Sequence, residues 1–263
     1  MLPSNLIITI IQTKLHWHNV EANLTHFTKK LNSIVEPTDV IVLPEMFTTG
    51  FTMQPAMFAE EHEGKGLTWM KQKAIEKKCA IVGSIAVKEN DHFFNRLYWV
   101  NVDGTYESYD KRHLFRMGNE HQHYVAGTKP LIIEYKGWKI CPLICYDLRF
   151  PVWSRNKKKN PYDVLIYVAN WPAVRSYPWE HLLIARAIEN QSYVVGVNRI
   201  GDDGNNVSHS GNSLVLNAKG EKINNVKLHE DTVETSSLSY QNLMDFRKAF
   251  PVLLDGDDFE MKP

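Results

Sequence analysis

Short apolar runs rich in β-branched residues recur along the chain and alternate with segments of helical periodicity. Their length and composition predict β-strands, and they are too numerous for a helical bundle. The predicted strands cover residues 6–11, 40–43, 80–87, 96–100, 131–135, 139–145, 164–168, 194–197 and 213–216. Asp103 and Gly104 supply turn chemistry between two strand-like runs and predict a hairpin there.

Helical periodicity predicts helices over residues 19–35, 67–78 and 179–191, the last having the clearest apolar face. The pattern therefore predicts a mixed α/β fold in which helices pack on sheets. No Ser/Gly linker, internal repeat or abrupt change of composition divides the chain, so we expect residues 1–263 to form one domain. After about residue 230 the sequence becomes polar, and we expect an irregular tail that lies across the surface or on a second subunit.

Composition and charge restrict the class of partner. The chain has 263 residues, and 43% of them are hydrophobic, enough for a large core. Its 30 basic and 30 acidic side chains cancel, which argues against nucleic acid or an anionic membrane as the partner. The three cysteines have no metal-type or CxxC spacing, the N-terminus lacks a signal-peptide pattern, and no apolar stretch approaches membrane-spanning length. These features predict a cytoplasmic protein.

Cys145 is the best candidate for a nucleophile. It ends a predicted buried strand and opens the sequence Cys-Tyr-Asp-Leu-Arg-Phe-Pro, which indicates a sharp turn from strand to helix. A thiol in such a turn lies beside backbone N–H groups that can stabilise an anion, and this arrangement favours acyl transfer. Taken alone, however, a buried cysteine is more often an inert core residue.

Two further residues complete a chemical set. Glu45 follows the predicted strand 40–43, at the strand edge where sites of α/β proteins are built. Lys111 follows the predicted hairpin in the sequence Asp-Lys-Arg-His-Leu-Phe. A carboxylate can take the proton of the thiol during attack and return it to a leaving amine. An ammonium group, together with the backbone N–H of Tyr146, can stabilise the oxyanion of the tetrahedral intermediate.

These motifs, with Arg186-Ala-Ile-Glu-Asn-Gln191, resemble over nearly the whole chain the nitrilase superfamily of carbon–nitrogen hydrolases. The resemblance implies a Glu-Lys-Cys triad, a four-layer α-β-β-α sandwich, no cofactor, and a homodimer or larger homo-oligomer formed through the outer helices near the nucleophile. It also implies a second glutamate in the site, seven residues before a glycine. Glu120 precedes Gly127 by that spacing and is therefore expected to position the lysine and the leaving amine.

Within the superfamily, residues 44–51 and 169–172 look most like the bacterial omega-amidases, which remove the terminal amide of 2-oxoglutaramate or 2-oxosuccinamate. A substrate of this type carries a carboxylate, and the guanidinium of Arg175 is the candidate that would bind it in a bidentate manner. We expect Phe47, Tyr124 and Trp171 to form apolar walls that exclude water.

Other interpretations remain open. The runner-up is another amidase or an N-carbamoyl hydrolase, and a more distant alternative is a scaffold that only binds ligands. A papain-like pair of Cys145 with a histidine such as His113 is a further possibility. His121 and His123 resemble a metal site only weakly, because no third ligand stands at a recognised spacing, and we expect no metal.

Overall fold

The structure is a computed structural model that describes residues 3–260. The strands are β1 Leu6–Gln12, β2 Val40–Val42, β3 Glu60–Glu61, β4 Ala80–Glu89, β5 His92–Val100, β6 Tyr106–Asp110, β7 Ile133–Tyr135, β8 Trp138–Ile144, β9 Val164–Ala169, β10 Tyr193–Asn198, β11 Ile200–Asp202, β12 Ser208–Ser210, β13 Leu214–Leu216 and β14 Thr232–Leu238. The α-helices are α1 Val20–Asn32, α2 Pro55–Phe58, α3 Lys65–Lys77, α4 Glu120–His123, α5 Pro151–Ser154, α6 Ser176–Asn190 and α7 Tyr240–Ala249. Short 3₁₀ turns are η1 Arg116–Gly118, η2 Cys145–Arg149, η3 Ala173–Arg175 and η4 Val252–Leu254.

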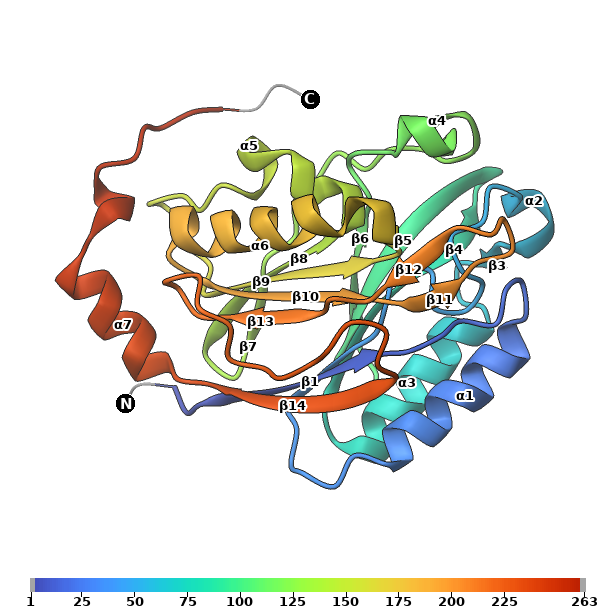
Figure 1. The fold of residues 1–263 in the computed structure, drawn as a ribbon, viewed down its shortest axis with the longest axis horizontal. Coiled ribbons are helices and arrows are strands. Elements are labelled where there is room, and N and C mark those ends of the chain that lie inside the picture. Colours follow the sequence, from blue (N-terminus) through green and yellow to red (C-terminus); the bar gives the residue numbers. More distant parts are fainter. Residues whose placement is uncertain (1–2, 261–263) are drawn as a thin grey trace.

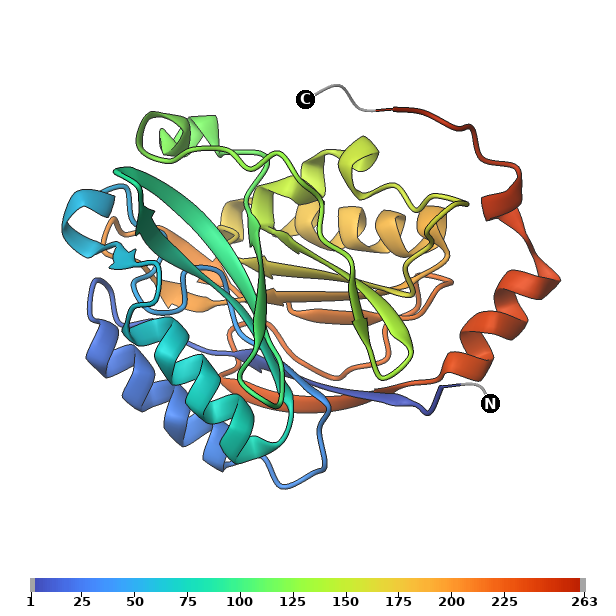
Figure 2. The same cartoon turned by 180° about the vertical axis from the view of Figure 1, so that it is seen from behind.

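Two mixed sheets form the centre of the molecule. The first has seven strands in the order β14-β1-β2-β4-β5-β6, with β3 beside β4. The second has five strands in the order β13-β10-β9-β8-β7, and β11 and β12 form a separate two-stranded ribbon. Figures 1 and 2 show α1 and α3 on one side of the paired sheets and α6 on the other. This arrangement is the expected four-layer α-β-β-α sandwich.

Alternation along the strands explains why the layers form. Val40 and Val42 belong to the core between the two sheets, whereas Ile41 belongs to the core beneath α1 and α3. Because successive side chains of a strand point to opposite faces, a strand with a helix layer on one side and a sheet on the other needs apolar residues throughout. The predicted helices and the hairpin at Gly104, which has φ of 82°, are confirmed.

The prediction of an irregular tail after residue 230 is wrong. Residues Thr232–Leu238 form β14, which pairs antiparallel with β1 in a register that sets Leu6 opposite Leu238 and Gln12 opposite Thr232. Helix α7 follows, and its cap Ser239 accepts a hydrogen bond from the backbone N–H of Asn242. β14 is an edge strand with four partly exposed residues at its start, so a polar sequence is compatible with a strand there.

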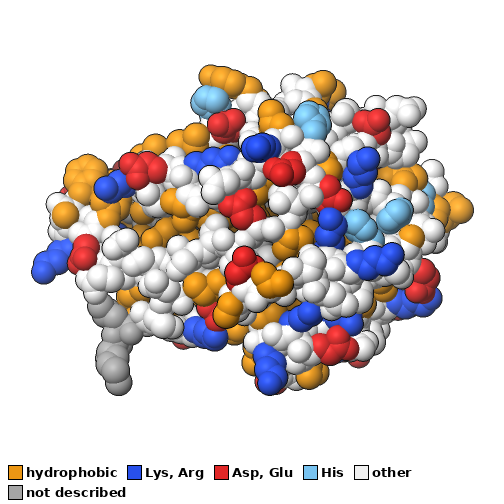
Figure 3. Space-filling view, turned by 60° about the horizontal axis from the view of Figure 1, so that its bottom comes forward, with side chains coloured by type: hydrophobic (Ala, Val, Ile, Leu, Met, Phe, Trp, Pro, Cys, Tyr) orange, Lys and Arg blue, Asp and Glu red, His pale blue; other side chains and the backbone are white. Residues whose placement is uncertain are grey.

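The surface carries mixed charge. Over the face shown in Figure 3, basic and acidic side chains are interspersed rather than gathered into fields of one sign. From residue 3 to residue 260, no helix has both the length and the apolar character that crossing a membrane requires.

Candidate active site

Four strand ends converge where the two sheets meet. Glu45 lies three residues beyond β2, and Lys111 directly follows β6, both in the first sheet. Cys145 directly follows β8 and Asn170 directly follows β9, both in the second sheet. The sequence therefore places its candidate proton acceptor and its candidate nucleophile on different sheets, and packing of the sheets brings them together.

Cys145 occupies the sharp turn that the sequence predicts. Its φ is 42°, a left-handed backbone conformation that is unfavourable for residues other than glycine, and it begins the 3₁₀ turn η2. The thiol is buried, with only 7% of the residue exposed. This turn ends β8 abruptly, and Cys145 and Tyr146 both line the same cavity.

Asp147 holds this turn in place. One carboxylate oxygen accepts hydrogen bonds from the backbone N–H of Ile144, at 3.1 Å, and from the hydroxyl of Tyr109, at 2.8 Å. The other oxygen accepts from the backbone N–H of His113 at 3.0 Å and lies 2.8 Å from its Nδ1. The ring of His113 is thus paired with Asp147 and stacked on Phe150, which argues against its use as a partner for Cys145.

Glu45, Lys111 and Glu120 form a fully buried ionic cluster. The Nζ of Lys111 lies 2.8 Å from Oε1 of Glu45 and 2.9 Å from Oε2 of Glu120. The second oxygen of Glu45 accepts the backbone N–H of Asn170 at 2.8 Å, and Glu120 accepts the backbone N–H of Phe115 at 2.6 Å. Such an arrangement limits the large desolvation cost of three buried charges, because each is paired and hydrogen-bonded.

Burial and neighbouring charge set the protonation states. Burial, and then the negative charge of Glu45, raises the pKa of the Cys145 thiol well above its usual value, although Lys111 acts in the opposite direction. Burial alone lowers the pKa of Lys111, but the two carboxylates of Glu120 and Glu45 outweigh it and hold that pKa above its usual value. Burial raises the pKa of Glu120 against the opposing effect of Lys111. At neutral pH the resting thiol is therefore protonated and the lysine is charged.

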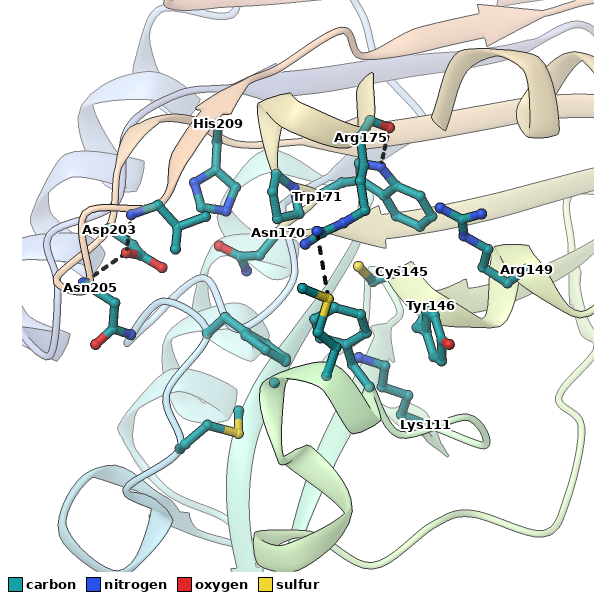
Figure 4. A pocket seen from close by; sticks show the side chains of 17 residues that line it. Lys111, Cys145, Tyr146, Arg149, Asn170, Trp171, Arg175, Asp203, Asn205 and His209 are labelled. Atoms are coloured by element: carbon teal, nitrogen blue, oxygen red, sulfur yellow. Dashed lines mark hydrogen bonds between the residues drawn. The ribbon is translucent and has the colours of Figure 1, made fainter. Parts of the chain in front are cut away.

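A cavity of about 260 Å³ opens beside the thiol. In Figure 4, Lys111, Cys145 and Tyr146 lie on one side of it, and Asp203 and Asn205 lie on the other. The walls also include apolar side chains, namely Phe51, Met53, Phe115, Met117, Trp171, Pro172 and Val207.

Polar side chains at the edge of the cavity differ in charge. Burial, and then the charge of Arg199, lowers the pKa of His209 to about 4, so this imidazole is neutral at physiological pH. Arg149 and Arg175 also line the cavity, and within residues 3–260 no acidic side chain forms an ion pair with either. Their guanidinium groups lie over the rings of Trp171 and Phe115 respectively.

The structure corrects two of the predicted walls. Phe47 is fully buried in the core beneath α1 and α3, where it packs against Phe27 and Trp69, and it does not line the cavity. Tyr124 lies in a small separate cluster, and its hydroxyl donates to the backbone carbonyl of Thr52. Both residues follow site motifs in the sequence, but their side chains point into the core. Trp171 does line the cavity, as expected.

Several residues of the site were not identified from the sequence, and three of them lie close to the catalytic candidates. Asn95 donates to both carboxylates of the cluster, Asn170 supplies a backbone N–H, and Arg149 lines the cavity. Arg149 and Asn170 lie within motifs that resemble those of the nitrilase superfamily. Their place in these motifs is the sequence signal that could have identified them. Asn95 lies one residue before the predicted strand 96–100, within the observed β5, and nothing in its local sequence distinguishes it from an ordinary strand residue.

The histidines near the site do not form part of a metal-binding group. Between residues 3 and 260 the structure brings together no set of three or more His, Cys, Asp or Glu side chains suited to holding a metal ion. His121 and His123 lie on the short helix α4, which carries Glu120 at its start.

Similarity to known proteins extends over the whole fold. The carbon-nitrogen hydrolase family model matches residues 7–247. Omega-amidase YafV of Escherichia coli (strain K12) is 48% identical over 256 residues, which cover 97% of this chain and 98% of that protein. The 2-oxoglutaramate amidase of Bacillus subtilis (strain 168) is 35% identical over 220 residues, which cover 82% and 84% respectively.

A solved structure agrees with these sequences. XC1258 from Xanthomonas campestris, described as a CN-hydrolase superfamily protein with an arsenic adduct in the active site, has a TM-score of 0.95 and 40% identity. The match covers 98% of this chain and 99% of that one. The chain therefore belongs to the carbon-nitrogen hydrolase family and is a hydrolase. The resemblance to the omega-amidase branch of the nitrilase superfamily, first seen in short motifs, extends over nearly the full length.

Proposed function

We propose that this hydrolase removes the terminal amide of 2-oxo acid amides such as 2-oxoglutaramate and 2-oxosuccinamate, and releases ammonia and a dicarboxylic oxo acid. The observation that carries the proposal is a buried, strained Cys145 beside an ionic Glu-Lys-Glu cluster. The cavity there also contains two guanidinium groups that pair with no acidic side chain of residues 3–260. Relatives named as an omega-amidase and a 2-oxoglutaramate amidase support the choice of substrate.

Acylation begins with the protonated thiol. Glu45 takes the proton as the sulfur of Cys145 attacks the amide carbon, and the carbonyl π electrons move to oxygen. Lys111 has three N–H bonds, and the two carboxylates leave one of them for the oxyanion, beside the backbone N–H of Tyr146. The C–N bond then breaks, Glu45 gives its proton to the departing nitrogen, and ammonia leaves a thioester on Cys145. Glu120 holds Lys111 and the leaving amine in position.

Hydrolysis of the thioester repeats these steps with water. Glu45 accepts a proton as the water oxygen attacks the thioester carbon, and the same donors stabilise the second oxyanion. When the C–S bond breaks, Cys145 regains its proton and the acid is released. One water is consumed and one ammonia is formed in each cycle.

The experiment that tests the function is an ammonia assay on a panel of oxo amides, simple amides, nitriles and N-carbamoyl amino acids. We expect release from the oxo amides, none from the Cys145→Ala variant, and an acyl adduct on Cys145 in a quenched reaction analysed by mass spectrometry. Turnover of an N-carbamoyl amino acid without turnover of either oxo amide would contradict the proposed substrate, whereas the proposed mechanism would still apply. Equal inactivity of the wild type and Cys145→Ala across the panel would favour a binding role.

Arg175 is the proposed site for the substrate carboxylate. It lies at the edge of the cavity, and among the described residues its guanidinium has no acidic partner and makes one side-chain contact as a donor, from Nη1 to the sulfur of Met117 at 3.9 Å, so its other donors can bind a carboxylate. Replacement of Arg175 by Met is expected to raise KM about 10- to 100-fold for an oxo amide, the equivalent of a charge-assisted hydrogen bond of roughly 1.5–3 kcal/mol. A neutral amide should be affected much less.

The Arg149→Met variant is the matched comparison, because Arg149 also lines the cavity and has no acidic partner in the described part of the chain. A larger rise in KM for Arg149→Met than for Arg175→Met would show that Arg149, and not Arg175, binds the substrate carboxylate. Equal effects on charged and neutral substrates would remove both residues from carboxylate binding.

We further expect the enzyme to act in the cytoplasm as a homodimer. Cys79, Cys141 and Cys145 are all free, which fits a reducing compartment. Exposed apolar residues lie along the helical layer next to the nucleophile, including Val152 on α5 and Tyr177 and Ile188 on α6. A self-complementary contact through this layer would cover them.

A further inference from the structure

Asn95 connects the two carboxylates of the site. Asn95 is fully buried on β5, and its Nδ2 donates to Oε1 of Glu45 at 2.8 Å and to Oε1 of Glu120 at 3.1 Å. The backbone carbonyl of Asn95 also accepts the N–H of Lys111 at 3.0 Å. We infer that Asn95 is a positioning residue that orients Glu45 for proton transfer from Cys145. This inference rests on the roles proposed above for Glu45 and Cys145, but not on the identity of the substrate.

A neutral donor is suited to this place because of the charges around it. Lys111 is the one cation that contacts Glu45 and Glu120 among the described residues, so two buried carboxylates share a single ammonium group. Two like charges at close range repel each other, and hydrogen bonds to the charged form offset part of that repulsion. The amide of Asn95 supplies one N–H to each carboxylate and adds no charge of its own.

The two carboxylate oxygens of Glu45 have different hydrogen-bond partners. Oε1 accepts from Lys111 and from Asn95, each at 2.8 Å. Oε2 accepts the backbone N–H of Asn170 at 2.8 Å and keeps a lone pair for the thiol proton. Removal of Asn95 frees one side of Oε1, so the carboxylate can rotate about its last bond and turn Oε2 away from the sulfur.

The other end of the amide supports this assignment. The Oδ1 of Asn95 is buried and has no hydrogen-bond partner among the described residues. An unpaired buried acceptor is unfavourable, so a residue retained only for packing would be better served by an apolar side chain. Reversal of the amide would bring Oδ1 against two carboxylate oxygens. The donor end is therefore the part of the side chain that this site uses.

The test replaces Asn95 by Leu, which is similar in size and has no donor. We expect kcat to fall about 10- to 100-fold with little change in KM, because misplacement of a catalytic group of about 1 Å has effects of this size. Alkylation of Cys145 by iodoacetamide, followed by mass spectrometry of the Cys145 peptide, should slow by a similar factor. Alkylation needs the thiolate but no substrate, so slowed alkylation would support the inference even if neither oxo amide were turned over.

The matched control is Asn224→Leu. Asn224 is also buried and makes two hydrogen bonds to the backbone, with Val215 and Ser213, but it lies outside the site. The Asn224→Leu variant should have a lower melting temperature than the wild type, with unchanged kcat and an unchanged alkylation rate. A loss of kcat in Asn95→Leu no larger than in this control, or a rise in KM alone, would overturn the inference. If Asn95→Leu does not fold, Asn95→Ala replaces it, and a wild-type alkylation rate in that variant would likewise overturn the inference.

Discussion

The backbone of Cys145 has a left-handed conformation that the rest of the turn enforces. Asp147 fixes this turn through Ile144, Tyr109 and His113, so the strain is held by buried hydrogen bonds rather than by the cysteine itself. A nucleophile on such a turn keeps its side chain and the following N–H in one orientation before substrate arrives, which is the preorganisation that oxyanion stabilisation requires.

The strain predicts an unusual order of stability among variants of Cys145. Glycine adopts a positive φ without steric cost, so Cys145→Gly is expected to be at least as stable as Cys145→Ala. Cys141, within β8, is the control, and there Gly should be less stable than Ala by about 1 kcal/mol. Urea unfolding of the four variants measures both differences. The same order at the two positions would show that Cys145 is not strained.

Lys111 neutralises two buried carboxylates, and its removal should be severe. Lys111→Met is expected to lower the free energy of unfolding by about 3–5 kcal/mol at neutral pH, because it leaves buried charge without a partner. Burial already raises the pKa of Glu120, and loss of the cation raises it further. A carboxyl group whose folded-state pKa is raised stabilises fully below its unfolded pKa, and this contribution is lost as the pH rises through the folded-state pKa.

The stability of Lys111→Met should therefore fall as the pH rises from about 4.5, the ordinary pKa of a glutamate. Urea unfolding at a series of pH values measures this slope. Lys65→Met is the control, since its ion pair with Glu21 is largely exposed to solvent and its loss should change stability little. A pH-independent loss in Lys111→Met would contradict the expected protonation of Glu120.

At the scale of elements, sequence patterns identified the segments whose environment is uniform. The central strands β4 and β9 are apolar along nearly their whole length because both faces are covered, so their runs were visible in the sequence. β14 was missed because an edge strand with a partly exposed face can be polar. The ribbon of β11 and β12 was missed because each strand has three residues and little apolar character.

The same contrast applies to the site. Glu45, Lys111 and Cys145 follow strands, and short motifs identified them before any geometry was known. Asn95 could not be recognised, since its function depends on two carboxylates that are distant in sequence. Phe47 and Tyr124 were assigned to the cavity wrongly, because neighbouring positions in sequence do not fix which side of a loop a ring occupies.

β14 protects the edge of the first sheet, which leads to a prediction about truncation. Without it, β1 would present an apolar edge, Leu-Ile-Ile-Thr-Ile-Ile-Gln, with unpaired backbone groups. A chain that ends at Asp231 is expected to aggregate, whereas one that ends at Asp255 should remain dispersed and folded. Light scattering and size-exclusion chromatography distinguish these outcomes. Well-behaved monomeric or dimeric particles from the shorter chain would contradict a protective role.

At the scale of the molecule, the helix layer near Cys145 is the predicted contact between subunits. Tyr177→Glu combined with Ile188→Glu places two charges on α6 and should convert the dimer to monomers, as measured by analytical ultracentrifugation. Ile75→Glu on α3 is the control, since Ile75 and Ile188 are both 53% exposed but lie on opposite layers. An unchanged mass of the double variant, or dissociation by Ile75→Glu, would place the contact elsewhere.

The pairing of β1 with β14 also has a consequence for how the enzyme is made. Leu6 and Leu238 are opposite each other in the sheet although almost the entire chain separates them in sequence. On the ribosome, β1 can pair with β2 early but must wait for β14 until residues 232–238 have been made, and contacts of such large sequence separation are slow to form. Glu45 and Lys111 emerge well before Cys145, and the first sheet closes last. The newborn chain thus completes its first sheet only after residues 232–238 have left the ribosome.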